Sequence, residues 1–389
     1  MKILWFPRLQ FDIDKFHIRT WKEMCDEIEA QGHMIEIAIG GKRDLSIFER
    51  DCINVPIIKL KGLRLLSYWV NGFILFNKKY FEYRPDAVIL HLLTIWFSLP
   101  LLLIPRNKRG RIIVDIRTPL YNLGNKQTRF RDNIFKIYSR ICFWYCKKFL
   151  SGVTVITSYF KDKICKEYQL DPDKVGVWSS GVNLSEFSSR KYILSPRPKE
   201  LKDKFFIMQH GEISYNRGIL ETVKSLSLIK NDDICLLLVG DSINKNKARE
   251  DAVKLAQELD IEKQILIIPP VTHKEVPKYI SYCDCAIMAY PLIDYWNYNN
   301  PIKLLEYLAM KKVVICPETW TFKNVIGIKK CGCFIKNNSP QAIAAGIQYC
   351  YKNRDLLYGW GSIGLKIVKE KYTWKQQALK LINFIENLR

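Results

Sequence analysis

Two segments in the second half of the chain combine glycines, cations and a helix start in a pattern that suits a phosphate-bearing ligand. The first follows an expected strand at 205–209 and runs from His210-Gly211 to Arg217-Gly218 before an expected helix at 219–229. A glycine at a strand end lets a ligand approach the main chain, and an arginine at a helix start adds a cation to the positive end of the helix dipole. We predict a diphosphate site here, although Arg217 taken alone would be interpreted as a solvated residue.

The second segment is an expected helix that begins near Asn300-Pro301 and leads to a strand at 313–316. Asn300 is a good N-cap and Pro301 suits the first helical position, so free amides beside Lys303 can bind phosphate oxygens. Glu306 follows one turn later, where its carboxylate can accept two ribose hydroxyls. A helical glutamate is more often simply solvated, and we expect both Glu306 and Arg217 to be exposed. The preceding loop carries aromatic residues that suit sugar stacking, namely Tyr295, Trp296 and Tyr298.

Other nucleotide and metal chemistries lack their usual motifs. No G-x-G-x-x-G or G-x-x-x-x-G-K-[ST] occurs, and the first glycine is Gly32, which disfavours nicotinamide and P-loop chemistry. None of the 12 cysteines forms a C-x-x-C pair, and the five histidines are scattered along the chain. We therefore expect no metal site and reduced, cytosolic cysteines.

The charge is strongly positive and unevenly distributed. The chain of 389 residues has a formal net charge of +22, which favours a polyanionic partner such as nucleic acid, an anionic membrane or a phosphorylated substrate. More than half of this excess lies in 52–150. Within it, 130–150 mixes aromatics with cations that include Arg140, Lys147 and Lys148, which is typical of interfacial membrane helices. The alternative is an amphipathic helix that covers a sheet with a solvated basic face.

Short apolar runs alternate with helix-length segments, which predicts an α/β protein with two Rossmann-like sheets. The apolar segment 87–105 is expected to be a buried strand and a helix ended by Pro105, rather than a membrane span. Met1 to Phe6 is too short an apolar stretch for a signal peptide. A polar linker at 188–204 places the domain boundary near 190. The predicted strands are 2–6, 34–40, 55–60, 87–92, 111–116, 152–157 and 175–179, then 205–209, 235–240, 265–269, 285–290, 313–316 and 332–335.

The two segments, together with Ser180-Gly181-Val182-Asn183, resemble the retaining glycosyltransferases of the GT-B fold, in particular the family 4 (group 1) sugar-nucleotide-dependent hexosyltransferases. The resemblance covers nearly the whole chain. It implies two Rossmann-like domains that face each other across a cleft. Residues 1–190 would bind the acceptor, 191–372 would bind the nucleotide-sugar donor, and a C-terminal helix at 373–389 would return to the first domain.

The resemblance also implies roles for single residues. Arg217 would hold the donor diphosphate and Glu306 the donor ribose, and both are candidate catalytic residues with Arg117. Further donor-binding candidates are Gly211, Gly218, Gly240 and Asp241, the base-facing Val271 and Thr272, and the helix-start residues Asn300, Pro301, Ile302, Lys303, Leu304 and Leu305.

Three positions depart from the family pattern. Tyr298 stands where the family has the first glutamate of its paired-glutamate motif, and Glu212 stands where it has an arginine beside Gly211. Asp115 and Arg117 occur where many members have a histidine. Tyr298, Asp115 and Arg117 are therefore weaker candidates for contacts with the donor sugar or an acidic acceptor.

The implied function is transfer of a hexose, with retention and without a metal, from a UDP- or GDP-sugar to a glycan or a polyprenyl- or lipid-linked acceptor. Such a reaction belongs to polysaccharide, lipopolysaccharide or glycolipid biosynthesis. It implies no separate cofactor and no nucleic-acid partner, and it places the enzyme in the cytoplasm, peripheral on the inner face of the membrane. Two alternatives remain: a sugar-nucleotide 2-epimerase of the same fold, and a basic nucleic-acid-binding protein, for which we find no zinc-finger, RNP1 or helix-turn-helix signature.

Overall fold

The computed structural model describes residues 1–7, 15–40, 52–58, 60, 63–119, 129–192, 197, 203–242 and 247–388. Side chains are considered at these positions except 15–17, 40 and 129–131. Most of the predicted linker 188–204 lies outside the described residues, as do the side chains that begin the basic helix at 130 and 131.

The chain divides into two compact units, the first comprising Met1–Ser180 with Trp374–Arg389 and the second comprising Gly181–Thr373. The division falls before the boundary near 190 that the linker suggests. Residues 181–187 contact the second unit, since the Val182 N–H donates to the Tyr372 carbonyl at 2.9 Å and the Phe187 ring meets that of His273.

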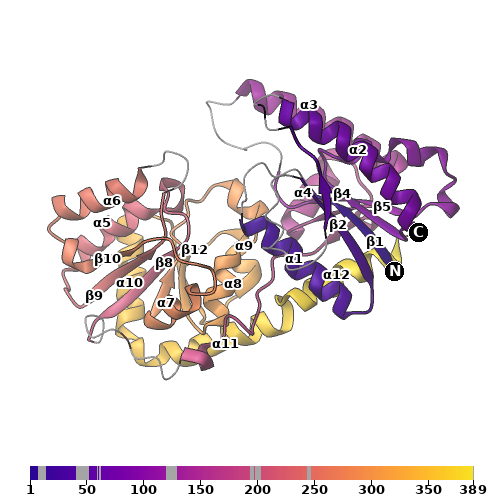
Figure 1. Ribbon diagram of the computed structural model, residues 1–389. Coiled ribbons are helices and arrows are strands. Elements are labelled where there is room, and N and C mark those ends of the chain that lie inside the picture. The colour runs from indigo at the N-terminus through magenta and orange to yellow at the C-terminus, as the bar shows by residue number, and fades with distance from the viewer. Residues whose placement is uncertain are drawn as a thin grey trace. The chain divides into compact units, whose positions relative to one another are not determined.

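The first unit is built on a seven-stranded parallel sheet in the order β3-β2-β1-β4-β5-β6-β7 (Figure 1). Its strands are β1 Lys2–Phe6, β2 Met34–Gly40, β3 Ile53–Val55, β4 Ala87–Leu90, β5 Arg111–Ile116, β6 Gly152–Val155 and β7 Val175–Val177. Its helices are α1 Lys15–Ala30, α2 Leu63–Tyr83, α3 Arg129–Phe149, α4 Ser158–Tyr168 and α12 Trp374–Asn387, with 3-10 segments η2 Ile95–Leu103, η3 Arg106–Lys108 and η5 Pro172–Lys174.

Helix α12 closes one face of this sheet. It packs against α1, and its Phe384 ring lies directly on Gly176 of β7, where a Cβ would come within 2.6 Å of the ring. The side chains of Trp374, Leu381 and Ile385 are buried. The return of the C-terminal helix to the first unit, as the sequence predicts, therefore depends on a glycine that makes room for an aromatic ring.

The second unit is built on a six-stranded parallel sheet in the order β10-β9-β8-β11-β12-β13 (Figure 1). Helices α5, α6 and α10 share one apolar core with this sheet, and α7, α8, α9 and α11 share another. The strands are β8 Phe205–His210, β9 Ile234–Val239, β10 Ile265–Ile268, β11 Cys285–Ile287, β12 Val313–Pro317 and β13 Gly332–Ile335. The helices are α5 Ile219–Ile229, α6 Ala248–Glu258, α7 Val276–Tyr282, α8 Ile302–Ala309, α9 Trp320–Ile326, α10 Pro340–Lys352 and α11 Leu357–Lys371, with 3-10 segments η6 Ser189–Tyr192, η8 Tyr215–Arg217, η9 Glu262–Gln264, η10 Asp294–Tyr298 and η11 Arg354–Leu356.

Two local expectations are wrong. The third strand is Ile53–Val55 rather than 55–60, and the apolar segment after β4 forms the 3-10 segment η2 rather than an α-helix. Pro100 lies inside η2 and lacks the N–H that a continuous α-helix would need there. Among the described helices, none combines the length and the apolar character needed to cross a membrane.

Candidate functional site

Two glycines of the second unit, Gly211 and Gly240, lie at the carboxyl ends of its central strands and allow close approach of the main chain. Gly211 follows β8 with a φ of +86°, and Gly240 follows β9 with a φ of +141°. A Cβ on Gly240 would overlap the Gly211 carbonyl, and one on Gly218 would overlap the Ala289 carbonyl. Because carboxyl ends of parallel strands carry ligand sites in open α/β sheets, these glycines lie at an edge that suits a bound ligand.

Two cationic side chains reach this edge from different elements. Lys303, in the first turn of α8, extends to Gly211, whose missing Cβ leaves room for the Lys303 ammonium. Arg217, at the end of η8, is held by Glu212: its Nη2 lies 2.7 Å from Glu212 Oε2, and its Nη1 donates to the Glu212 carbonyl at 3.0 Å. Glu212, which replaces the family's arginine, therefore orients Arg217.

Burial makes the charge of Lys303 costly. Desolvation, with the like charge of Arg217 nearby, lowers the pKa of Lys303 from 10.5 to about 7. Glu306 and Glu212 oppose this change without overcoming it. Lys303 therefore sits close to its titration midpoint at neutral pH, and a bound anion would favour its charged form.

The start of α8 differs in detail from the prediction. The helix begins at Ile302, and its N-cap is Pro301, which has extended backbone angles and provides no side-chain cap. The Leu304 N–H donates to the Pro301 carbonyl at 3.0 Å, so this amide is already used within the chain. The expectation that Asn300 caps the helix is wrong, because the chain turns into the helix one residue later. Asn300 itself is buried.

Glu306 is buried rather than exposed, which corrects the sequence prediction. Its side chain is 2% exposed, with Oε2 2.9 Å from His210 Nε2 and Oε1 2.6 Å from His273 Nε2. Burial tends to raise the pKa of Glu306, but the hydrogen bonds from the two histidines outweigh burial and hold its pKa well below its usual range. The carboxylate is therefore ionised and already bonded at both oxygens.

The two histidines were missed by the sequence analysis. His210 ends β8 and His273 lies in the loop between β10 and α7, so they are 96 and 33 residues from Glu306 in sequence. Only the parallel sheet brings them to one carboxylate. The available signal was positional: His210 directly precedes Gly211, and His273 directly follows Thr272, both of which were predicted site residues.

Of the predicted aromatic wall before α8, Tyr298 packs inward, whereas Tyr295 and Trp296 are partly exposed. Tyr298 is 1% exposed and donates from its hydroxyl to Asp294 Oδ2 at 2.9 Å. The Trp296 ring lies against the Tyr290 ring, with 4.3 Å between centroids. Tyr298 therefore supports the loop from within and presents no stacking face to a sugar, whereas Trp296 is only partly buried.

The remaining donor-binding candidates lie on loops at the same edge of the sheet. Asp241 follows Gly240, and its carbonyl accepts the Ile213 N–H at 2.9 Å, which ties the loop after β9 to the loop after β8. Thr272, after Val271, donates from both its N–H and its hydroxyl to Glu275 Oε2, at 2.9 and 2.7 Å. These bonds fix the loop that carries His273.

In the first unit, Asp115 and Arg117 lie at the carboxyl end of β5. Asp115 accepts hydrogen bonds from Thr154 Oγ1 at 2.7 Å and from Trp178 Nε1 at 2.9 Å, and burial raises its pKa despite Arg117 nearby. The Arg117 guanidinium lies 3.5 Å from the Trp178 ring centroid and donates to the Trp178 carbonyl at 2.7 Å. Burial lowers the pKa of Arg117 to about 10, which leaves it charged at neutral pH.

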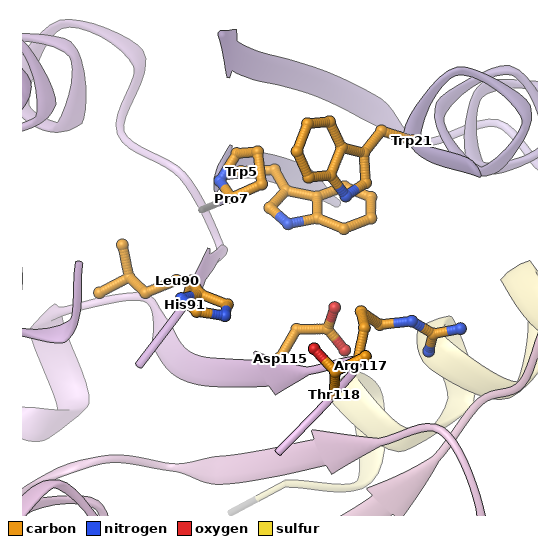
Figure 2. A pocket seen from close by; sticks show the side chains of 8 residues that line it. All are labelled: Trp5, Pro7, Trp21, Leu90, His91, Asp115, Arg117 and Thr118. Carbon is orange, nitrogen blue, oxygen red and sulfur yellow. The ribbon is translucent and has the colours of Figure 1, made fainter. Parts of the chain in front are cut away.

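A cavity of about 20 Å³, enough for one water molecule, adjoins these residues. Figure 2 shows the indole rings of Trp5 and Trp21 on one side of the cavity, with Asp115 opposite them. The lining residues are Trp5, Pro7, Trp21, Leu90, His91, Asp115, Arg117 and Thr118.

The predicted membrane-facing cations on α3 are exposed, as are several apolar residues beside them. Arg140, Lys147 and Lys148 all lie on the solvent side of the helix. The same side carries a stripe of apolar residues that are about half exposed, namely Ile134 51%, Ile137 59%, Ile141 47% and Trp144 52%. An exposed apolar stripe beside cations is unusual for a helix that only covers a sheet.

Two family descriptions match almost consecutive parts of the chain: "Glycosyltransferase Family 4" over residues 19–186 and "Glycosyl transferases group 1" over residues 193–366. An uncharacterized glycosyltransferase of Methanocaldococcus jannaschii is 22% identical over 242 residues, which is 59% of this chain and 58% of that protein. TuaH of Bacillus subtilis, whose name describes a teichuronic acid biosynthesis glycosyltransferase, is 25% identical over 169 residues, 42% of this chain and 39% of TuaH. The matches thus span less than two thirds of each relative.

Solved structures share the whole fold. The Anabaena protein HepE, crystallised in complex with UDP, aligns with a TM-score of 0.73 over 100% of both chains at 12% identity. At this identity the likeness establishes the fold, which is two Rossmann-like units of the GT-B type.

Proposed function

We propose that this chain, which belongs to the group 1 glycosyltransferases of family 4 and has their GT-B fold, transfers a hexose with retention from a UDP- or GDP-sugar to a glycan or lipid-linked acceptor. The observation that carries this proposal is the convergence of Gly211, Arg217 and Lys303 at the carboxyl edge of the second sheet, with the ionised Glu306 one helical turn after Lys303 on α8. This combination of cations, open main chain and carboxylate matches a ribose and a diphosphate.

The donor would lie along this edge. Arg217, Lys303 and the amides at the start of α8 would hold the diphosphate, and Glu306 would bind the ribose hydroxyls. Asp241 and the loop carrying Val271 and Thr272 would approach the nucleotide. UDP is the first nucleotide to test because HepE has been solved with UDP.

The residues at this edge would stabilise the departing diphosphate. As the bond to the sugar breaks, negative charge develops on the leaving phosphate oxygens, where Arg217 and protonated Lys303 can neutralise it. In a same-face displacement the acceptor hydroxyl gives its proton to that leaving phosphate. No strong protein base and no divalent metal are then required. Arg117 remains our candidate in the first unit for contact with the donor sugar or an acidic acceptor.

For the acceptor, we propose a lipid-linked or surface glycan reached from the cytoplasmic face of a membrane. The exposed stripe of α3, with Arg140, Lys147 and Lys148 beside it, supports attachment to an anionic leaflet, where each cation contributes about 1 kcal/mol. Further exposed apolar residues of the first unit are Leu66 59%, Ile74 60% and Leu103 88%. The name of TuaH points to the same class of surface polysaccharide.

The test is nucleotide binding by calorimetry combined with transfer assays. UDP or GDP should bind the wild-type protein, and Arg217→Ala should weaken binding by about 1 to 3 kcal/mol while the exposed control Lys224→Ala on α5 leaves it unchanged. Wild-type affinity in Arg217→Ala would contradict the donor site. Conversion of the sugar nucleotide to its 2-epimer without any acceptor would instead support the epimerase alternative.

A further inference from the structure

The Glu306 carboxylate is the centre of a buried chain of polar contacts that no motif predicted. Tyr307 contacts His210 Nδ1 through its hydroxyl at 2.7 Å, and His210 Nε2 lies 2.9 Å from Glu306 Oε2. On the other side, His273 Nε2 lies 2.6 Å from Glu306 Oε1, and His273 Nδ1 lies 3.8 Å from Glu186 Oε2. Each carboxylate oxygen therefore has its own histidine.

The two histidines differ in how firmly they are held. His210 belongs to strand β8, its side chain is 5% exposed, and both of its ring nitrogens are bonded to buried groups. His273 lies in a loop, and its side chain is 33% exposed, whereas that of Glu306 is 2% exposed. His273 is thus the partly exposed member of the pair, and its ring is bonded to a carboxylate that has almost no exposed surface of its own.

We propose that His273 is a gate on the ribose contact of Glu306. A ribose presents two neighbouring hydroxyls, which a carboxylate accepts through both of its oxygens. The structure leaves no exposed carboxylate surface for them while His273 covers Oε1. The ring of His273 must therefore turn away from Glu306 before the ribose can bind, while His210 keeps the carboxylate in place from behind. This inference rests on the proposed role of Glu306 in donor binding.

Such a gate would make the measured nucleotide affinity weaker than the affinity of the conformation in which the His273 ring is turned away from Glu306. A ligand that binds only one conformation loses affinity in proportion to the fraction of protein in that conformation. A charge-assisted hydrogen bond of this kind stabilises the closed conformation by an amount that corresponds to about 10-fold in population. Removal of the His273 ring should thus tighten nucleotide binding, which is the opposite of what loss of a direct ligand contact would do.

The experiment measures UDP and GDP affinities by calorimetry for the wild-type protein, His273→Ala and His273→Asn. The asparagine side chain is too short to reach Glu306 from the same position, and it provides a second variant if alanine perturbs folding. Thermal unfolding of each variant without ligand reports on folding. Lys274→Ala, an exposed neighbour, is the matched control for changes in the loop. We expect about 10-fold tighter binding in both His273 variants and no change in Lys274→Ala.

Two further measurements separate the gate from other effects. The increase in nucleotide affinity in the His273 variants should be smaller for 2′-deoxy-UDP, because this ligand presents only one of the two ribose hydroxyls. It should also vanish when His273→Ala is introduced into Glu306→Gln, because the gate acts only through that carboxylate. Folded His273 variants that bind nucleotide as weakly as the wild type, or more weakly, would overturn the inference.

Failure of the proposed function gives a different result. If the wild-type protein binds neither UDP nor GDP, or if Glu306→Gln leaves their affinity unchanged, Glu306 is not the ribose contact. The proposed role of His273 as a gate is then wrong as well. If binding depends on Glu306 but His273→Ala does not tighten it, only the gate is wrong.

Discussion

Lys303→Met should reveal a stability cost that the donor site imposes on the fold. Lys303 has a pKa of about 7 in the folded protein, against 10.5 as its ordinary value, chiefly because of burial. Between pH 7 and pH 10.5 the unfolded chain therefore binds one more proton than the folded chain, and the free energy of unfolding rises with pH in this window. Below pH 7 Lys303 is protonated in both the folded and the unfolded chain, so the free-energy cost of burying its charge no longer changes with pH. Methionine has a similar shape and carries no charge.

The magnitude follows from the same values. Each pH step of one in this window corresponds to about 1.36 kcal/mol, so the full effect between pH 7 and pH 9 is about 2.7 kcal/mol. Because part of the Lys303 side chain keeps contact with solvent, we expect the advantage of Lys303→Met over the wild type to shrink by about 1 to 2 kcal/mol between pH 6 and pH 9. This corresponds to about 2 to 8 °C in Tm for a unit of this size.

The assay is thermal unfolding at pH 6 and pH 9 of the wild type, Lys303→Met and the exposed control Lys224→Met. The difference in stability between wild type and variant is taken at each pH, so the contributions of other titrating groups, which both proteins share, cancel. A stability difference that is the same at both pH values, or a Lys303→Met protein that is less stable than the wild type at pH 6, would refute the reasoning. The same variant should lose nucleotide affinity, and the wild-type affinity should fall as the pH rises above 7, because the charged form of Lys303 binds the diphosphate.

Three other outcomes test separate parts of the argument. Transfer activity should survive EDTA, since cations of the chain hold the diphosphate, and a loss that Mg²⁺ restores would contradict this. Gly240→Ala should destabilise the second unit by about 2 to 4 kcal/mol in denaturant unfolding, because φ is +141° and the new Cβ would overlap the Gly211 carbonyl, whereas Gly359→Ala, with open space around it, should not. Replacement of Arg140, Lys147 and Lys148 with Glu should weaken sedimentation with anionic liposomes at low salt and leave UDP affinity unchanged, and equal binding to neutral liposomes would argue against membrane attachment.

The strands were predictable because parallel, fully buried strands are continuous apolar runs bounded by polar loops. Twelve of the thirteen predicted runs overlap well with strands of the two sheets in the described residues, whereas 55–60 shares only its first residue with β3, and α5 has the predicted bounds 219–229. The misplaced elements have local causes. The segment after β4 is apolar enough for a helix, but Pro100 and its short connection to β5 favour 3-10 turns.

The structure brings several of the predicted donor-site residues to one edge of the second sheet, but their contacts were not predicted from the sequence. The sequence predicted Arg217 and Lys303 at helix starts and Glu306 one turn after Lys303. These placements follow from the spacing of neighbouring residues in the sequence. That spacing could not show that Glu306 is buried, because its burial depends on His210 and His273, which reach it only through the order of strands β8, β9 and β10. Tyr298 shows the same limit, since its partner Asp294 lies in its own loop but its burial depends on the fold around η10, which contacts α9.

The charges of the second unit explain why an anionic ligand would be favoured at this edge. Glu306 stays ionised because two histidines donate hydrogen bonds to it, so its carboxylate is already stabilised by groups within the chain. Arg217 is paired with Glu212 at its own loop, whereas Lys303 has no ion-pair partner among the described residues and has lost most of its preference for a proton. A bound diphosphate would give the Lys303 ammonium a negatively charged partner. It would thereby raise the pKa of Lys303 and offset the cost of burying its charge. Binding and folding are then coupled through one lysine, so a nucleoside diphosphate should stabilise the wild-type protein more than Lys303→Met.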